Sequence, residues 1–203
     1  LEDIKLFALL TKHFTYFLDS APDPFAALSR FEKIIPDLLN MKKEGKWLDL
    51  LMNKESARDL ARILGTSKYL WEDFLRQQYE NLIPLLSAEK PKQGYALPIE
   101  DIDTRLDKRI THCASLQEKI SSLNEIKDKE TLLMDIDHLL RPESDFLLLS
   151  KRLSKLAEAV VTKAFTLAYD EIIKTTGHPT TIAGSRVPYA LFGLGKLGGQ
   201  ALG

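Results

Sequence analysis

Apolar side chains recur every three or four positions along most of this sequence, the spacing that places them on one face of an α-helix. The chain opens with one such stretch, which predicts a first helix. Comparable stretches after it predict four more short helices, which begin near Asp23, Trp47, Ser56 and Ser67. Short helices bury their apolar faces by packing together, so residues 1–86 are predicted to form an N-terminal helical bundle. The first stretch is defined by Ile4, Phe7, Leu10, Phe14, Phe17 and Leu18.

Local signals predict where these helices begin and end. Asp23-Pro24 combines an N-cap residue with a proline at the first helical position. Pro36 is expected to kink or restart the second helix, because proline has no N–H to donate. Ser56 is the predicted cap of the fourth helix, and Gly65 is its predicted end.

A loop rich in proline, glycine and charge, residues 87–98, leads to a second helical segment, residues 99–176. Its first helix starts at Ile99, and the apolar spacing continues to Ile120. The longest helix of the chain runs from about Phe146 to Thr176, with Ser144 or Asp145 as its cap. A helix of that length extends over more than about 40 Å.

Residues 177–203 depart from the helical pattern. Gly177-His-Pro179 is predicted to end the long helix, and a connector follows. Tyr189 to Phe192 is an apolar, strand-like run that leads into a turn with glycines at positions 193, 195, 198 and 199. The expected fold class is therefore mostly α, with any strand confined to about Tyr189 to Leu194.

Composition limits the classes of protein to which this helical pattern can belong. Of the 203 residues, 44% are hydrophobic and 28% are charged, as in a soluble globular protein with a buried core. A net charge of −1 gives no basic field for nucleic acid, and no apolar run approaches the roughly 20 residues of a membrane span. The single cysteine, Cys113, and the lack of a signal peptide favour the cytoplasm. Both ends are expected to be cut from a longer protein.

The glycine turn is the strongest candidate for chemistry. Without a Cβ, the backbone at a glycine can adopt positive φ and approach a ligand, and successive N–H groups can converge on an anion. Lys196 is the only charge in the turn. We therefore expect phosphate to bind at five residues, which are Gly193, Gly195, Lys196, Gly198 and Gly199.

Two better-known phosphate motifs fit this turn less well. The spacing Gly193-x-Gly195-x-x-Gly198 matches the dinucleotide fingerprint, but that fingerprint also needs a complete βαβ unit and an acid roughly 20 residues further on. The chain reaches only Gly203. A P-loop is rejected because the spacing is wrong and no Ser or Thr follows Lys196.

Acidic and histidine side chains predict no further site. Carboxylates two residues apart share one side of a strand, but in a helix they diverge by about 200°. The pairs Asp101/Asp103 and Asp135/Asp137 fall in predicted helices, so neither pair is expected to hold a metal ion. Adjacent His112 and Cys113 make no dyad, and no metal-ligand spacing relates His13, His112, His138 and His178.

The residues of the glycine turn are more specific than their spacing. Gly193-Leu-Gly-Lys-Leu-Gly-Gly199 resembles the Gly-x-Gly-Lys-Leu-Gly-Gly motif of the glutamine synthetase adenylyltransferase family, in the nucleotidyltransferase superfamily. Two helical segments resemble the same family, Leu153-Ser-Lys-Leu-Ala-Glu-Ala-Val160 and Leu60-x-x-Ile-Leu-Gly-x-Ser67-x-x-Leu70. The resemblance covers about Leu60 to Gly203. The family's Arg-x-Pro is missing near Gln78, and residues 127–134 have few of its arginines.

This resemblance implies that residues 177–203 start a truncated α/β nucleotidyltransferase domain with its first strand and glycine-rich turn. It implies transfer of AMP from ATP to a tyrosine of glutamine synthetase, or its removal by phosphorolysis, in nitrogen regulation. ATP and Mg²⁺ are the implied cofactors, and glutamine synthetase and a PII-type signalling protein are the implied partners. The family's acidic metal motif follows its glycines and is not in this chain, so the fragment is expected to be inactive and to bind neither cofactor tightly.

Two other classes of protein remain open. The first is a helical interaction or regulatory module whose turn has no catalytic role. The second is a fragment of a dinucleotide-binding oxidoreductase. Residues beyond Gly203 would separate the three, because an Asp-x-Asp or Asp-x-Glu pair favours the adenylyltransferase and an isolated acid about twenty residues on favours the oxidoreductase.

Overall fold

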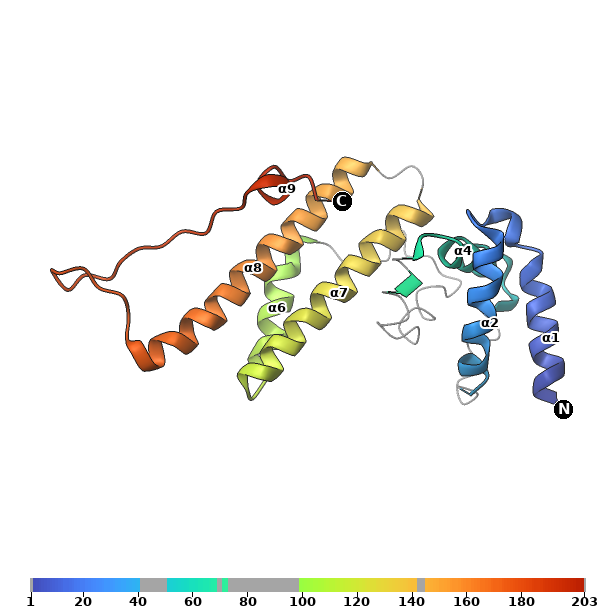
Figure 1. The fold of residues 1–203 in the computed structure, drawn as a ribbon, viewed down its shortest axis with the longest axis horizontal. Helices are drawn as coiled ribbons and strands as arrows, with labels where there is room; N and C mark the ends of the chain where they lie inside the picture. Colours follow the sequence, from blue (N-terminus) through green and yellow to red (C-terminus); the bar gives the residue numbers. More distant parts are fainter. Residues whose placement is uncertain (1, 41–50, 69–70, 73–98, 142–144, 203) are drawn as a thin grey trace. The chain divides into compact units, whose positions relative to one another are not determined.

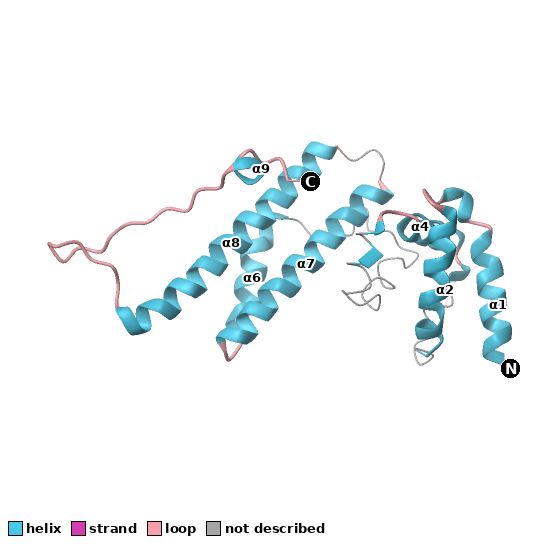
Figure 2. Ribbon diagram, in the orientation of Figure 1, coloured by secondary structure: helices cyan, strands magenta, loops and turns pink. Residues whose placement is uncertain are grey.

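The structure is a computed structural model that describes residues 2–40, 51–68, 71–72, 99–141 and 145–202 (Figure 1). Within these ranges the regular secondary structure is helical and no β-strand is present, which Figure 2 shows by colour. One isolated β-bridge joins Thr180 to Arg186. The prediction of a mostly α fold is therefore confirmed. None of the helices in these ranges combines the length and apolar character needed to cross a membrane.

The chain divides into two compact units. The first comprises residues 1–95 with 135–142, and the second comprises residues 96–134 with 143–203. Three of the predicted features fall mainly or wholly outside the described ranges. They are the helix near Trp47, the helix that starts near Ser67 and the loop at residues 87–98.

The first unit contains α1 (Glu2–Thr15), the 3₁₀ turn η1 (Leu18–Ser20), α2 (Pro24–Asn40) and α4 (Lys54–Leu64). Helix α2 packs against both α1 and α4. The rings of Phe14 and Phe31 stack between α1 and α2 with centroids 3.8 Å apart. Around them the apolar positions of the predicted pattern are buried, among them Leu10, Ile35, Leu60 and Leu64.

Three helix ends in this unit test the local predictions. Asp23 caps α2 as predicted, since its Oδ1 accepts from the N–H of Ala26 at 2.9 Å. Helix α2 continues through Pro36 to Asn40, so it does not restart there. Proline removes one hydrogen bond, and here Pro36 and the residue four before it are both exposed, so water can satisfy the freed carbonyl.

Helix α4 begins earlier than predicted and ends where predicted. Its cap is Asn53, whose side chain accepts from the N–H groups of Glu55 and Ser56, so Ser56 lies inside the first turn. Gly65 ends the helix, and its carbonyl accepts from the N–H of Asp23 at 3.1 Å. The guanidinium of Arg30 donates to two more carbonyls at this end, those of Leu64 and Thr66.

The second unit contains η4 (Ile99–Asp101), α6 (Ile102–Thr111), α7 (Leu116–Leu140, whose last turns belong to the first unit) and α8 (Phe146–Thr176). Helix α8 begins and ends as predicted, with Asp145 as its cap and Gly177 after its last turn. Helix α6 lies against α8 through apolar residues and two ion pairs, Asp103 with Lys155 and Asp107 with Lys163. A nearly buried ion pair, Arg105 with Glu130, joins α6 to α7.

The helix predicted from Ile99 to Ile120 is two helices. The Ser115 hydroxyl accepts from the N–H of Glu118, and the Glu118 carboxylate accepts from the N–H of Ala114. This reciprocal pair is a form of the capping box, which starts a new helix at Leu116. The apolar spacing continues across the junction, so periodicity alone conceals it.

Gly65 allows a prediction about the stability of the first unit. A Cβ added there would lie 2.8 Å from the Cβ of Ala21 and 3.0 Å from the carbonyl oxygen of Asp23. We expect Gly65→Ala to lower the free energy of unfolding by about 1–3 kcal/mol, the usual effect of overpacking. Urea denaturation measures this change. Arg58→Ala on the exposed side of α4 is the matched control, expected to stay within about 0.5 kcal/mol, and an equally stable Gly65→Ala variant would contradict the close packing.

The Arg105–Glu130 pair allows a second prediction. The Glu130 side chain is 6% exposed, whereas that of Arg105 is 21% exposed. Arg105→Met strands a buried carboxylate and should cost about 3–5 kcal/mol of unfolding free energy, because an uncompensated charge is then buried. Glu130→Met should cost less, since Arg105 can reach water. Thermal unfolding of both variants and of the double variant tests this, and a double variant less stable than Arg105→Met would contradict it.

Candidate functional site

The segment before the glycine turn is not a strand. Residues 187–194 have no regular secondary structure, and Tyr189, Phe192 and Leu194 are 59%, 85% and 84% exposed. The strand predicted at Tyr189 to Leu194 is therefore absent from the described residues. A strand is defined by hydrogen bonds to a neighbouring strand, and no described segment supplies them here.

The glycine turn folds into a single short helix, α9 (Gly195–Gly198), which lies against α8. The backbone bonds of the turn are local, from the N–H of Gly198 to the carbonyl of Leu194 at 3.4 Å and from that of Gly199 to Gly195 at 3.0 Å. The turn brings Gly193 against Gly198, since a Cβ on Gly198 would lie 2.3 Å from the carbonyl oxygen of Gly193. All five predicted site residues therefore lie in one compact turn.

Positive φ occurs at Gly195, where it is 59°, and at Gln200, where it is 53°. Neither Gly198 nor Gly199 has positive φ, and that of Gly199 is −87°. Gln200 N–H donates to Leu197 and Ala201 N–H donates to Lys196, which is the Schellman pattern that ends many helices. That pattern needs left-handed backbone one residue after the cap, and the cap is Gly199.

The turn presents a small set of donors to solvent. The first N–H groups of a helix have no intrahelical acceptor, and in α9 they belong to Gly195, Lys196 and Leu197. Gly195 has open space where a Cβ would be, so an anion could approach it closely. Lys196 is exposed beside it. By contrast, the N–H groups of Gly198 and Gly199 already donate within the turn, so they do not serve as phosphate donors in this conformation.

The structure places the four carboxylates of the acidic pairs on helices or at a helix start. Asp103 pairs with Lys155 at 3.8 Å, which links α6 to α8, and Asp101 is exposed at the start of α6. Asp137 is buried in α7, one residue beyond Ile136. In the ranges that the structure describes, no three His, Cys, Asp or Glu side chains gather closely enough to hold a metal ion.

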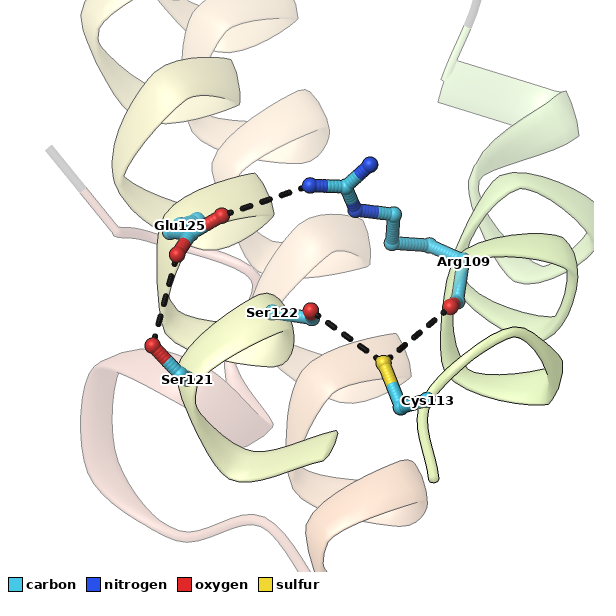
Figure 3. A network of polar contacts seen from close by, with 5 residues as sticks. All are labelled: Arg109, Cys113, Ser121, Ser122 and Glu125. Carbon is cyan, nitrogen blue, oxygen red and sulfur yellow. Dashed lines mark hydrogen bonds and ion pairs between the residues drawn. The ribbon is translucent and has the colours of Figure 1, made fainter. Parts of the chain in front are cut away.

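His112 and Cys113 contact different groups. The Cys113 thiol lies 3.4 Å from the carbonyl oxygen of Arg109 and 3.3 Å from the hydroxyl of Ser122, where α6 meets α7 (Figure 3). The Glu125 carboxylate forms an ion pair with Arg109, at 3.6 Å, and accepts a hydrogen bond from the Ser121 hydroxyl on its own helix, at 3.3 Å. These contacts join two helices, and the predicted lack of a His–Cys dyad agrees with the side chain of His112, which meets the carbonyl of Lys108.

Sequence reasoning missed several residues that shape the turn. Leu197 is half-buried, and its side chain would lie 3.2 Å from a Cβ on Gly193. Gln200 takes the left-handed position that glycine usually occupies, so composition gave no signal for it. The spacing of the glycines predicts where the turn is, and its hydrogen bonds determine which residue has which conformation.

In the described residues, this geometry defines a mostly helical protein with a glycine turn whose first N–H groups have no intrahelical acceptor. Residues 57–203 match the sequence profile of glutamate-ammonia ligase adenylyltransferase. This chain belongs to that family, because the matched range covers well over half of it and contains both α8 and the glycine turn. The resemblance expected from about Leu60 onwards is confirmed.

Two relatives share one description, bifunctional glutamine synthetase adenylyltransferase/adenylyl-removing enzyme. The protein from Acinetobacter baylyi is 25% identical over 182 residues, which cover 85% of this chain and 19% of the relative. The protein from Idiomarina loihiensis is 26% identical over 196 residues, which cover 85% of this chain and 18% of the relative. The chain thus spans less than a fifth of the length of these relatives. No solved structure matches the chain significantly.

The closed turn allows a third prediction. Gly198→Ala must separate Gly198 from the Gly193 carbonyl, so it should open the turn, whereas Gln200→Gly should relieve the left-handed residue and close it further. Trypsin cleavage after Lys196 measures the opening. We expect about tenfold faster cleavage for Gly198→Ala, which corresponds to about 1.4 kcal/mol, and slower cleavage for Gln200→Gly.

Matched peptides of residues 189–203 correct these rates for the effect of each substitution on trypsin itself. Because the turn is exposed, the melting temperature should change little in either variant. Equal corrected rates for Gly198→Ala and the unchanged protein would show that the Gly193–Gly198 contact does not hold the turn closed.

Proposed function

We propose that this chain is part of an enzyme that transfers AMP to glutamine synthetase and removes it, and that its glycine turn binds the phosphates of ATP. The observation that carries the proposal is the turn itself, which lies within the family match and combines three N–H groups without an intrahelical acceptor, an open glycine and an exposed lysine. Family membership excludes the dinucleotide-binding oxidoreductase. A helical interaction module remains as an outcome of the test.

In the proposed reaction, the hydroxyl oxygen of a tyrosine of glutamine synthetase attacks the α-phosphorus of ATP. The bond from that phosphorus to the bridging oxygen breaks, pyrophosphate leaves, and the tyrosine proton passes to a base. Removal is proposed to proceed by phosphorolysis, in which an oxygen of inorganic phosphate attacks the phosphorus of the tyrosine-bound AMP. The bond from that phosphorus to the tyrosine oxygen breaks, ADP forms, and the released tyrosine takes up a proton. Catalysis of this kind depends mainly on positioning and on stabilising charge.

The residues of this chain contribute the positioning. The N–H groups of Gly195, Lys196 and Leu197 donate to phosphate oxygens, and Gly195 leaves room for the phosphate to come close. The ammonium of Lys196 offsets part of the negative charge. Gly193 and Gly198 act on the ligand indirectly, because their contact sets the shape of the turn.

Magnesium is proposed as the second cofactor, on the family resemblance. It would neutralise charge on the phosphates of ATP. The described residues include no cluster of carboxylates that fits it, so we assign it no ligands in this chain. The fragment by itself is proposed to lack AMP transfer activity and to hold neither cofactor tightly.

The wider context follows from the same proposal. The names of the two relatives combine attachment and removal, so both activities are proposed for the full-length protein, with glutamine synthetase as substrate. A PII-type signalling protein as regulator and a cytoplasmic location are proposed with them. Residues 177–203 are proposed to start the nucleotidyltransferase domain, preceded by helical parts at residues 1–86 and 99–176.

The test is AMP incorporation from α-labelled ATP into glutamine synthetase by the full-length protein. Because the turn must keep its shape to bind phosphate, Gly198→Ala should lower kcat/KM for ATP by about 100-fold. Lys196→Ala should lower it by about tenfold or less, since an exposed charge contributes little. Lys174→Ala near the end of α8 is the matched control for a lost lysine and should keep full activity.

Two results would overturn the proposal. If the full-length protein without substitutions neither transfers nor removes AMP, the helical interaction module becomes the better description. A folded Gly198→Ala enzyme with near-normal transfer would instead remove the phosphate role of the turn and leave the family activity in place. Thermal unfolding of each variant confirms that it is folded.

A further inference from the structure

Two aromatic residues of α8 face the segment that leads to the glycine turn. Phe165 and Tyr169 are four residues apart and therefore lie on one side of the helix, with ring centroids 5.9 Å apart. The ring of Tyr189 packs on both of them, at 4.8 Å from Phe165 and 5.3 Å from Tyr169. Tyr189 lies four residues before Gly193, so this contact is made close to the start of the turn.

The same tyrosine also holds the other end of the connector. The Tyr169 hydroxyl lies 3.1 Å from Nδ1 of His178, and the two rings are 5.9 Å apart. His178 directly follows Gly177, whose φ of 73° reverses the chain after α8. Both ends of the connector between residues 178 and 189 are therefore attached to Tyr169.

Hydrogen bonds within the connector close it into a loop. The N–H of Thr181 donates to the carbonyl of Ser185 at 2.8 Å, and that of Val187 donates to Pro179 at 3.0 Å. These bonds bring Val187 back beside the start of the connector, two residues before Tyr189. In Figure 1 the loop extends beyond the end of α8 and the chain then returns along that helix to α9.

The segment between Tyr189 and the turn has few other attachments. Leu191, Phe192 and Leu194 are 46%, 85% and 84% exposed. Glycines have no side chain with which to hold a turn against a helix. The aromatic contact at Tyr189 therefore acts together with the contact of α9 on α8, where Leu197 is half-buried, to set the position of the turn along α8.

We propose that Phe165 and Tyr169 are positioning residues for the glycine turn, acting through Tyr189 and His178. Their rings fix where the segment after the connector meets α8, and so where the donors of Gly195 to Leu197 lie. The anchoring stands on the ring contacts alone. Its consequence for ATP rests on the proposed function, because only then does the turn bind a phosphate.

The experiment compares variants of the full-length protein. Tyr189→Leu and Tyr169→Leu remove an aromatic ring, Tyr169→Phe keeps the ring and removes the hydroxyl, and Ile172→Ala alters an exposed residue of the same helix as the control. Hydrogen–deuterium exchange measured by mass spectrometry reports on peptides that cover residues 190–201. Steady-state kinetics give kcat, the KM for ATP and the KM for glutamine synthetase.

Both leucine variants should speed exchange in residues 190–201 by about tenfold, while exchange in α6 and in the first half of α8 stays unchanged. The KM for ATP should rise by about tenfold with the KM for glutamine synthetase within about twofold of normal. In Tyr169→Phe, which keeps the ring, the exchange rate of residues 190–201 and the KM for ATP should both stay near normal. A merely destabilised protein would lose kcat and exchange faster throughout, so it would not give this separation of the two KM values.

The other outcomes are each decisive. Unchanged exchange at residues 190–201 in both leucine variants overturns the anchoring. Faster exchange with an unchanged KM for ATP, in an enzyme that does transfer AMP, overturns the positioning of the phosphate donors. If the protein without substitutions transfers no AMP, only the proposed function is contradicted. Hydrogen–deuterium exchange in the variants then decides whether the anchoring is correct.

Discussion

A turn made largely of glycine cannot hold its own position, and the second unit depends on α8 to supply that position. Glycines offer neither apolar side chains to bury nor long side chains to pair, and their backbone is the most costly to order. Helix α8 is long, and it is continuous from Phe146 to Thr176. Ion pairs join it to Asp103 and Asp107 of α6. Aromatic rings near its C-terminal end contact Tyr189, in the segment before the turn.

The two ends of α8 therefore have different kinds of contact. One face of its first half is buried, as the burial of Ser154, Leu156 and Ala159 shows. Its second half is mostly exposed, and the aromatic cluster lies there. Contacts on an exposed helix face open more easily than contacts in a core, so the position of the glycine turn is less firmly fixed than the packing of the first half.

Sequence predicted those parts of the fold that local chemistry determines. The predicted and observed bounds of α8 agree at both ends. Asp145 is a good cap, the apolar pattern is unbroken and Gly177 can take positive φ. The junction of α6 and α7 was missed because apolar spacing runs through it, although the capping pair Ser115 and Glu118 was readable.

Other parts depend on contacts that no local pattern contains. Tyr189 to Leu194 has strand-forming residues, but a strand exists only when a partner pairs with it. The aromatic cluster joins residues up to 24 positions apart, Phe165 and Tyr189, through a connector whose path no periodicity describes. The glycines located the turn that holds the five candidate residues, while the attachment of that turn to α8 could not be predicted.

The four glycines of the turn also show why a motif is a weaker statement than a structure. Gly195 is needed for its positive φ and for open space, and Gly198 is needed because a Cβ would meet the carbonyl of Gly193. Gly199 has negative φ, at −87°, and the left-handed position after it belongs to Gln200. Different physical reasons lie behind one residue type, and the N–H groups that have no intrahelical acceptor lie at the start of α9 and not at the glycine pair that ends it.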